Sequence, residues 1–484
     1  MQTQVIPFSV PPTRQPDRRR WLMLTIVLAA ALIAVLDSFI VNVTLPSIER
    51  ELHANFAQIQ LVVAGYTLSY AVLLVTGGRL GDLYGRKRLF LLGVGGFTLC
   101  SALCGFAPNA VLLISFRVLQ GGAAALMFPQ VLSFIHVTFE PAERPRAFGY
   151  FTAVTGLGSI LGQVVGGFLL TANLFHLGWR SIFLVNVPIG ILALLAALPL
   201  LRESRGTEAR RLDVGGIVLF IFALFLLVFP LVEGGNAGWP LWALLCLVLS
   251  VPLFMAFIAY EQRILKEEET PLIRLSLFRQ RRFTSGILTV GLSYSLFASN
   301  LFLLAFYLQT ILRLSPLQAG LVIMMSSIAY VLASTFNPAL SSRLGRWDMF
   351  VAAGLITLGY LLIFLGTQFV VPWWGIPPLL VALFILGLGS GSLMTPLLNK
   401  TLTGIAHQEA GTASGVFTTA MFTAGALGVA VIGLLDATLL RNSGSPLHAF
   451  MLSVGVIALL SLGLLLTVQP LSKPLTSPTE SASR

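Results

Sequence analysis

Two ionisable residues, Asp37 and Arg117, stand inside long apolar stretches of the chain. A charged side chain at the centre of a membrane span costs about 2.5–3.5 kcal/mol on insertion scales, so both residues are candidates for function. A carboxylate in a low-dielectric cavity can bind and release a proton, and it can also attract a cationic substrate. A buried guanidinium needs partners, and a nearby acid would link proton binding to helix movement. The two residues therefore predict a proton-coupling site.

Structural roles for the same residues stay open at this stage. Neighbouring hydroxyls such as Ser38 and Thr44 would cap Asp37, and backbone carbonyls at a helix crossing would hold Arg117. Three further polar residues in apolar runs are candidates for supporting substrate binding or coupling: Asn42, Tyr66 and Gln120. For Tyr66, the alternative is a hydrogen bond between helices.

A polar, glycine-rich stretch at 77–88 separates two apolar runs and is predicted to be a cytoplasmic hinge loop. Its glycines allow helix ends to approach closely, and its cations favour the cytoplasmic side. A carboxylate near a helix N-terminus or an arginine would form a charge-assisted latch. The candidates for this conformational latch are Gly78, Asp82, Gly85, Arg86 and Lys87. A generic basic loop between spans is the alternative.

Composition places the chain among polytopic helical membrane proteins. Of its 484 residues 56% are hydrophobic and only 10% are charged, whereas soluble domains carry roughly a quarter charged residues. The net charge of +11 is spread over short loops, which argues against a nucleic-acid partner. The three cysteines lie in apolar runs and predict packing rather than a disulfide or metal site. No catalytic constellation or Walker loop indicates an enzyme or an ATP-driven pump.

Hydropathy predicts fourteen spans of about 20 residues. They are expected near 21–43, 56–76, 88–107, 109–137, 147–171, 181–201, 213–231, 239–260, 283–307, 317–338, 348–368, 374–399, 411–435 and 447–468. If the amino terminus is cytoplasmic, all but five of the 30 Lys and Arg residues fall on the inner side. This bias predicts cytoplasmic termini.

The same pattern predicts the domain organisation. A tail at 1–20 precedes a six-helix half at 21–201, two inserted helices at 213–260 and a linker at 261–282 on the membrane surface. A second six-helix half at 283–468 and a tail at 469–484 follow. The segment 340–346 echoes 80–86, with Ser342 in place of Asp82, as expected of halves related by duplication.

Several of these segments resemble motifs of known transporters. The segment 78–87 resembles the loop between the second and third helices of the major facilitator superfamily. The run from Asp37 to Pro46, with Asn42 five residues after the acid, resembles the first-helix motif of drug:proton antiporters. Arg117 followed by Gln120-Gly121 resembles the superfamily's fourth-helix motif, which is implicated in proton transfer. The segments 179–190 and 212–216 resemble signatures of the fourteen-span branch.

Four glycines in the fifth predicted span resemble the antiporter motif and are candidates for helix packing: Gly158, Gly162, Gly166 and Gly167. Three of them recur every four residues and would form one smooth face on which another helix packs, although generic packing is an equal alternative. The chain departs from the family pattern at Gln163, where family members usually have proline. This change removes an expected kink and puts an amide in the membrane.

The resemblance implies a major facilitator fold of two six-helix halves plus two inserted helices. It further implies a multidrug exporter of the bacterial inner membrane that needs no cofactor beyond the proton gradient. Its expected partners are a small-molecule substrate, protons and the lipid bilayer, and a periplasmic adaptor protein stays open. The alternatives are an exporter dedicated to one metabolite, lipid or siderophore, and a proton-independent facilitator.

Overall fold

A computed structural model of the protein describes residues 19–140, 143–205, 213–234, 238–266, 275–367, 375–405 and 410–472. Within these ranges the chain forms helices and turns and contains no strand. Fourteen helices of the described chain are long and apolar enough to cross a membrane. The predicted all-α polytopic class and the number of spans are therefore confirmed.

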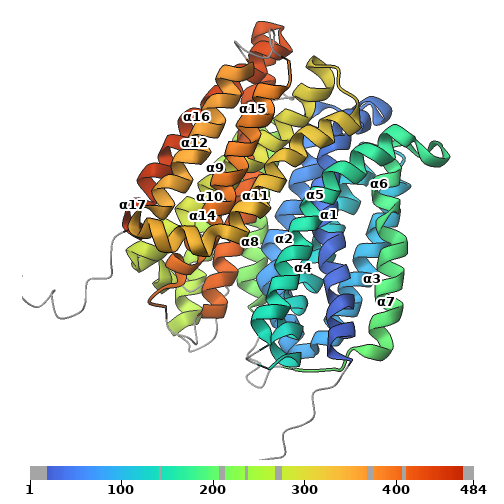
Figure 1. Ribbon diagram of the computed structural model, residues 1–484, viewed down its shortest axis with the longest axis vertical. Coiled ribbons are helices and arrows are strands. Elements are labelled where there is room, and N and C mark those ends of the chain that lie inside the picture. Colours follow the sequence, from blue (N-terminus) through green and yellow to red (C-terminus); the bar gives the residue numbers. More distant parts are fainter. Residues whose placement is uncertain are drawn as a thin grey trace, which may run out of the picture.

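The first half of the chain forms six spans, which run from blue to green in Figure 1. They are α1 (Arg20–Leu52), α2 (Phe56–Tyr84), α3 (Arg86–Gly105), α4 (Ala110–Thr138), α5 (Arg144–Ala172), and a broken sixth span made of η2 (Gly178–Arg180), α6 (Ser181–Leu184) and α7 (Asn186–Leu200). Because successive spans alternate in direction, the bundle has a near face, where α2 ends, and a far face, where α2 begins.

The second half of the chain also forms six spans. They are α10 (Arg281–Phe306) continued by η4 (Tyr307–Ile311), α11 (Pro316–Leu344), α12 (Asp348–Leu365), α14 (Pro377–Leu402), α15 (Ala410–Ser443) and α16 (Pro446–Thr467). Three short helices complete this part of the chain: η3 (Leu275–Arg279), η5 (Gly345–Trp347) and α17 (Gln469–Ser472). Helix α17 falls where a tail was predicted. Arg20 of the predicted amino-terminal tail begins α1. Residues 1–18 and 473–484 of the predicted tails and 267–274 of the predicted linker lie outside the described residues.

Two further helices, α8 (Val214–Glu233) and α9 (Leu241–Lys266), lie between these halves in the sequence and pack on each other. Val228 and Val232 of α8 pack against Ala57 of α2 and Ala430 of α15. Helix α8 therefore contacts the junction where the two halves meet. The predicted domain limits stay a prediction.

Several helix starts are fixed by side chains that cap free backbone N–H groups. Asn55 accepts from the Gln58 N–H while Gln58 reaches back to the Asn55 N–H, which forms a capping box before α2. Ser315 and Gln318 form the same motif before α11. Such caps offset the cost of unpaired N–H groups at helix ends.

The prediction of a hinge loop at 77–88 is wrong in its local structure. Helix α2 continues to Tyr84 and α3 begins at Arg86, so Gly85 alone separates them. Gly85 has φ of 113°, a conformation that L side chains rarely adopt, and this explains why a glycine breaks the helix there. The polar stretch is thus the end of one helix and the start of the next.

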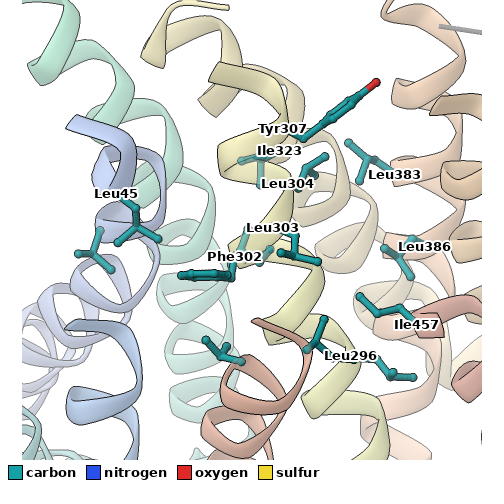
Figure 2. Close-up of a cluster of buried hydrophobic side chains, with 14 of the residues drawn as sticks. Leu45, Leu296, Phe302, Leu303, Leu304, Tyr307, Ile323, Leu383, Leu386 and Ile457 are labelled. Carbon is teal, nitrogen blue, oxygen red and sulfur yellow. The ribbon is translucent and has the colours of Figure 1, made fainter. Parts of the chain in front are cut away.

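One cluster of buried hydrophobic side chains runs through both halves (Figure 2). Phe302 of α10 points toward the side where Leu45 of α1 lies, while Leu303 points toward Leu386 of α14 and Ile457 of α16. Helix α10 therefore packs within its own half and also against the first helix. The closest packing between the halves joins α2 to α15 and α5 to α11.

Candidate functional site

A buried polar network surrounds Asp37 in the middle of α1. Arg117 Nη1 of α4 donates to Asp37 Oδ2 at 2.5 Å, and the two side chains are only 1% and 0% exposed. Gln120 Nε2 and Asn186 Nδ2 both donate to Asp37 Oδ1, at 3.1 and 2.9 Å. Two other helices, α4 and α7, thus supply the partners of one carboxylate on α1.

Arg117 uses the rest of its guanidinium within the same network. Its Nε donates to the Val62 carbonyl at 3.2 Å, and its Nη1 also donates to Gln120 Oε1 at 2.9 Å. The Tyr66 ring lies over the guanidinium, 4.2 Å from Cζ to the ring centroid, in a cation–π contact. Arg117 therefore contacts both a nearby acid and a backbone carbonyl, which combines the two roles considered from sequence.

The hydroxyls suggested as caps for Asp37 bond elsewhere. Ser38 donates to the Ala34 carbonyl, and Thr44 donates to the Val41 carbonyl, both within α1. The alternative in which these two hydroxyls satisfy Asp37 is therefore wrong.

Sequence reasoning missed Asn186 as a partner of Asp37. Asn186 also donates to Ser101 Oγ at 3.1 Å, and Ser101 donates to the Phe183 carbonyl at 2.9 Å. The residue lies inside the segment 179–190, whose family resemblance was the available signal. Nothing in its spacing indicated that it would reach the first helix.

This arrangement makes the contacts of Arg117 depend on the charge of Asp37. With Asp37 ionised, the pair is neutral overall and its polar atoms are largely hydrogen-bonded. Protonation of Asp37 would remove the charge that Arg117 neutralises and leave a buried cation held by Gln120, Val62 and Tyr66. A buried uncompensated charge is costly. A rearrangement of the helices that gives Arg117 a new partner or water would therefore lower the free energy.

A central cavity lies directly beside this network. It has a volume of about 60 Å³ and lies between four helices, α1 and α2 from the first half and α10 and α15 from the second. The lining residues are Ser38, Phe39, Asn42, Val63, Tyr66, Thr67, Tyr70, Tyr294, Phe297, Ala298, Leu301, Phe422, Gly425, Ala426 and Val429. Tyr66 belongs both to the wall of the cavity and to the Arg117 contact, so its ring separates the ion pair from the cavity.

Aromatic rings form a continuous series around the cavity. Tyr70 packs edge-on against Phe422 at 4.8 Å between centroids, and Phe422 contacts Tyr294 at 5.4 Å. Tyr294 in turn contacts Phe297 at 5.7 Å, and Tyr70 stacks parallel to Tyr66 at 6.3 Å. Such ring faces bind cations and flat aromatic groups.

Asn42, predicted to support substrate binding, lines this cavity but bonds within its own helix. Its Nδ2 donates to the Ser38 carbonyl at 3.1 Å. Gln120, by contrast, belongs to the Asp37 network and lies outside the cavity wall. The structure therefore separates the predicted supporting residues into a cavity group and a network group.

The glycines of α5 lie against two different helices. A Cβ on Gly158 would lie 3.2 Å from Val35, and one on Gly162 would lie 2.8 Å from the Leu36 carbonyl, both on α1. Gly166 faces Ile40 of the same helix. Gly167 faces α11 instead, since its Cβ would lie 2.6 Å from the carbonyl oxygen of Pro316.

The predicted latch residues lie on the near face, but they do not form a single cluster. Asp82 accepts from Arg86 at 2.8 and 3.1 Å, and its side chain is 43% exposed. Lys87 Nζ donates to the Leu198 carbonyl at 2.6 Å at the end of α7, and so bonds away from Asp82. A Cβ on Gly78 would meet Pro129 of α4 at 3.5 Å, an ordinary contact.

Glu203, which sequence reasoning missed, caps the start of α3. Its carboxylate accepts from the backbone N–H groups of Lys87 and Arg88, at 3.0 and 3.3 Å. Anions are favoured at helix N-termini because free N–H groups point outward there. A single acidic residue in a short basic segment gives no clear sequence signal for this role.

The echo of the polar stretch in the second half has its own acid. Gly345 ends α11 with φ of 55°, as Gly85 ends α2. Asp348 at the start of α12 accepts from Lys400 Nζ of α14 at 2.5 Å and from Ser341 Oγ at 2.8 Å. The acid that seemed to be lost at Ser342 is thus supplied by Asp348.

Comparison with known proteins places the chain in one family. The Major Facilitator Superfamily model matches residues 27–429 and 283–483. The chain is 40% identical over 435 residues to a protein named probable actinorhodin transporter of Streptomyces coelicolor, covering 89% of this chain and 75% of that one. It is 34% identical to a tetracenomycin C resistance and export protein of Streptomyces glaucescens, covering 87% and 76%. It is 32% identical to the multidrug resistance protein Stp of Mycobacterium tuberculosis, covering 85% and 75%.

Solved structures agree on the fold. A POT family transporter superposes with a TM-score of 0.67 at 15% identity, covering 93% of this chain and 96% of that one. The nucleoside transporter NupG superposes with a TM-score of 0.66 at 13% identity, covering 94% and 100%. The fold and the matches together define a multi-pass membrane transporter. The chain belongs to the Major Facilitator Superfamily, and relatives at 32–40% identity are named as antibiotic transport and drug resistance proteins.

Proposed function

We propose that the protein is a proton-coupled secondary active exporter of small amphiphilic or cationic compounds, of the multidrug efflux type. One observation carries the proposal: a buried Asp37–Arg117 pair lies beside a cavity shared by both halves, and the ring of Tyr66 both contacts Arg117 and lines that cavity. The export names of the relatives support the direction of transport. On this reading the protein is a transporter and not an enzyme.

In the proposed cycle, Asp37 takes up a proton when the cavity faces outward, and the substrate leaves. Protonation breaks the charge balance with Arg117, and the guanidinium shifts toward Gln120, Val62 and the Tyr66 ring. Tyr66 forms part of the cavity wall, so its movement changes the substrate site. The halves then rock to face inward, as alternating access requires, and Asp37 releases the proton.

We propose further that the near face is cytoplasmic and that the protein lies in a bacterial inner membrane. The bias of Lys and Arg toward loops of that face supports this orientation. Substrate would enter the cavity from the cytoplasm or the lipid. The proton gradient would supply the energy for export, and no cofactor would be needed. Whether a periplasmic adaptor protein receives the exported compound is a separate question for binding experiments.

The test is uptake of a fluorescent lipophilic cation into proteoliposomes with an acidic interior. Wild-type protein is expected to accumulate the cation against its gradient, and Asp37→Asn is expected to abolish gradient-driven accumulation. The matched control is Asp436→Asn, since Asp436 of α15 is bonded by Ser453 and lies outside the cavity lining. This control is expected to keep coupled uptake.

Other results would point to other functions. Uptake that ignores the pH gradient in folded wild-type protein would contradict proton coupling and indicate a facilitator. Equal loss in Asp37→Asn and Asp436→Asn would remove the special role of Asp37. Gradient-driven transport of only one compound from a broad panel would indicate a dedicated exporter.

A further inference from the structure

Gln163 is the residue of α5 that departs from the family pattern, and it reaches the other half of the protein. Its side chain is 1% exposed, and its Nε2 donates to Ser327 Oγ of α11 at 3.1 Å. Helix α5 runs without a break from Arg144 to Ala172 around it. An amide thus stands where the family motif usually has proline, and it bonds across the junction between the halves.

The backbones of α5 and α11 approach very closely around this hydrogen bond. A Cβ on Gly320 would lie 2.4 Å from the carbonyl oxygen of Gln163, and a Cβ on Gly167 would lie 2.6 Å from that of Pro316. Small residues permit this approach in membrane helices. The contact occupies the part of each helix toward the far face, since α11 begins there at Pro316 and α5 ends there at Ala172.

Three hydrogen bonds between described residues of the two halves use a backbone carbonyl as the acceptor. Gln309 Nε2 donates to Val43 at 2.7 Å, Thr419 Oγ1 donates to Ala71 at 3.1 Å, and Gln60 Nε2 donates to Val429 at 3.5 Å. A carbonyl is always present, whatever the side chain. The Gln163–Ser327 bond differs because both partners are side chains, so a substitution at either position removes it.

We propose that Gln163 is a positioning residue whose bond to Ser327 latches the α5–α11 junction, and so sets the fraction of molecules whose cavity is closed toward the far face. For the cavity to open there, α5 and α11 must separate and this bond must break. The latch involves neither the proton site nor the substrate cavity. It therefore stands even if the proposed proton coupling fails.

The chemistry of the amide makes the latch reversible. Within the described residues, Gln163 Oε1 is buried without a hydrogen-bond partner. The closed state gains one hydrogen bond but leaves this acceptor unpaired, whereas opening would let water reach both groups. Hydrogen bonds between membrane helices are modest in strength for similar reasons. Removing one is expected to change the ratio of open to closed molecules by about threefold in the average case and by about tenfold where the bond is stronger.

The test measures opening of the far face directly, as a distance between spin labels. Labels are placed at Phe168→Cys on α5 and Leu321→Cys on α11, since both residues are exposed large hydrophobics near the far ends of their helices. Cys246→Ser is included in every sample because that thiol is partly exposed, while Cys100 and Cys104 are buried. Pulsed electron resonance then gives the populations of short and long distances.

Ser327→Ala is the informative variant, because it leaves the Gln163 amide buried without a partner. We expect the long-distance population to rise about threefold to tenfold relative to the short one. The matched control is Ser326→Ala, whose hydroxyl bonds to the Ile323 carbonyl of its own helix at 2.8 Å. This control is expected to leave the populations unchanged.

A second background separates the latch from a general effect on packing. In protein that already carries Gln163→Leu, Ser327→Ala removes no hydrogen bond, so it is expected to leave the populations as they are. The proposal is overturned if Ser327→Ala has no effect in the parent, if it has the same effect in the Gln163→Leu background, or if Ser326→Ala shifts the populations equally.

Discussion

The two halves of the protein each hold an acid paired with a base, yet the pairs lie in different surroundings. Asp37 and Arg117 meet in the middle of α1 and α4 and are almost wholly buried. Asp348 and Lys400 meet at the near face, where the aspartate side chain is 4% exposed but the lysine side chain is 27% exposed. A pair that water reaches can change its charge at little cost, whereas a buried pair cannot. The difference lies in the base, since water reaches Lys400 but not Arg117, and it supports the proposed role of the Asp37–Arg117 pair in coupling.

Removing the base of the buried pair should give the largest effect. Arg117→Met leaves the Asp37 carboxylate buried with only two amide donors, and we expect a loss of about 3–5 kcal/mol in the free energy of unfolding. Thermal unfolding of the purified protein in detergent measures the change. The double variant Asp37→Asn with Arg117→Met should recover most of the stability and yet stay inactive in gradient-driven uptake. A single variant as stable as the wild type would contradict the burial argument.

Removing the base of the second pair should have an intermediate effect. Lys400→Met leaves Asp348 with the Ser341 hydroxyl and the Met349 N–H as donors. We expect a loss of about 1–3 kcal/mol, because a charged group loses one partner while keeping two others. Coupled uptake should keep its dependence on the pH gradient, since this pair lies outside the cavity lining. Loss of that dependence would mean that both halves carry coupling groups.

Neutralising the exposed acid of the near face should have the smallest effect on stability. Asp82→Asn weakens an (i, i+4) pair whose acid is 43% exposed, and the expected change in the free energy of unfolding is within about 0.5 kcal/mol. If Asp82 latches one conformation, the turnover number should fall while substrate affinity changes little. Unchanged turnover in a transport assay would remove the latch assignment.

Much of the candidate site could be predicted from individual residues. Asp37 and Arg117 stood out because a charge in an apolar run is costly and needs a partner, and the structure brings these two together. The near-face stretch at 77–88 was recognised by its composition, although its helical structure was not. The close packing of Gly77 and Gly81 against α4 holds the stretch in a helix as far as Tyr84, and Gly85 alone interrupts it.

The residues that sequence reasoning missed share one property: each acts on an element distant in the chain. Asn186 reaches Asp37 from 149 positions away, and Glu203 caps α3 from 116 positions away. Gln163 was noticed as a missing proline and as an amide in the membrane, but its partner Ser327 lies 164 positions further on. Side chains of this kind have no local period or spacing that would reveal their partners.

The sequence by itself determined the class of the protein, its fourteen spans and the residues whose charge must be neutralised inside the membrane. These properties follow from local physics, because hydropathy, helix length and the cost of a buried charge depend on the residues alone. The tertiary structure alone decided which groups meet, such as Tyr66 between the ion pair and the cavity, and Gln163 against Ser327. Those contacts depend on how helices from distant parts of the chain are packed and turned, and small residues such as Gly320 set how closely they approach.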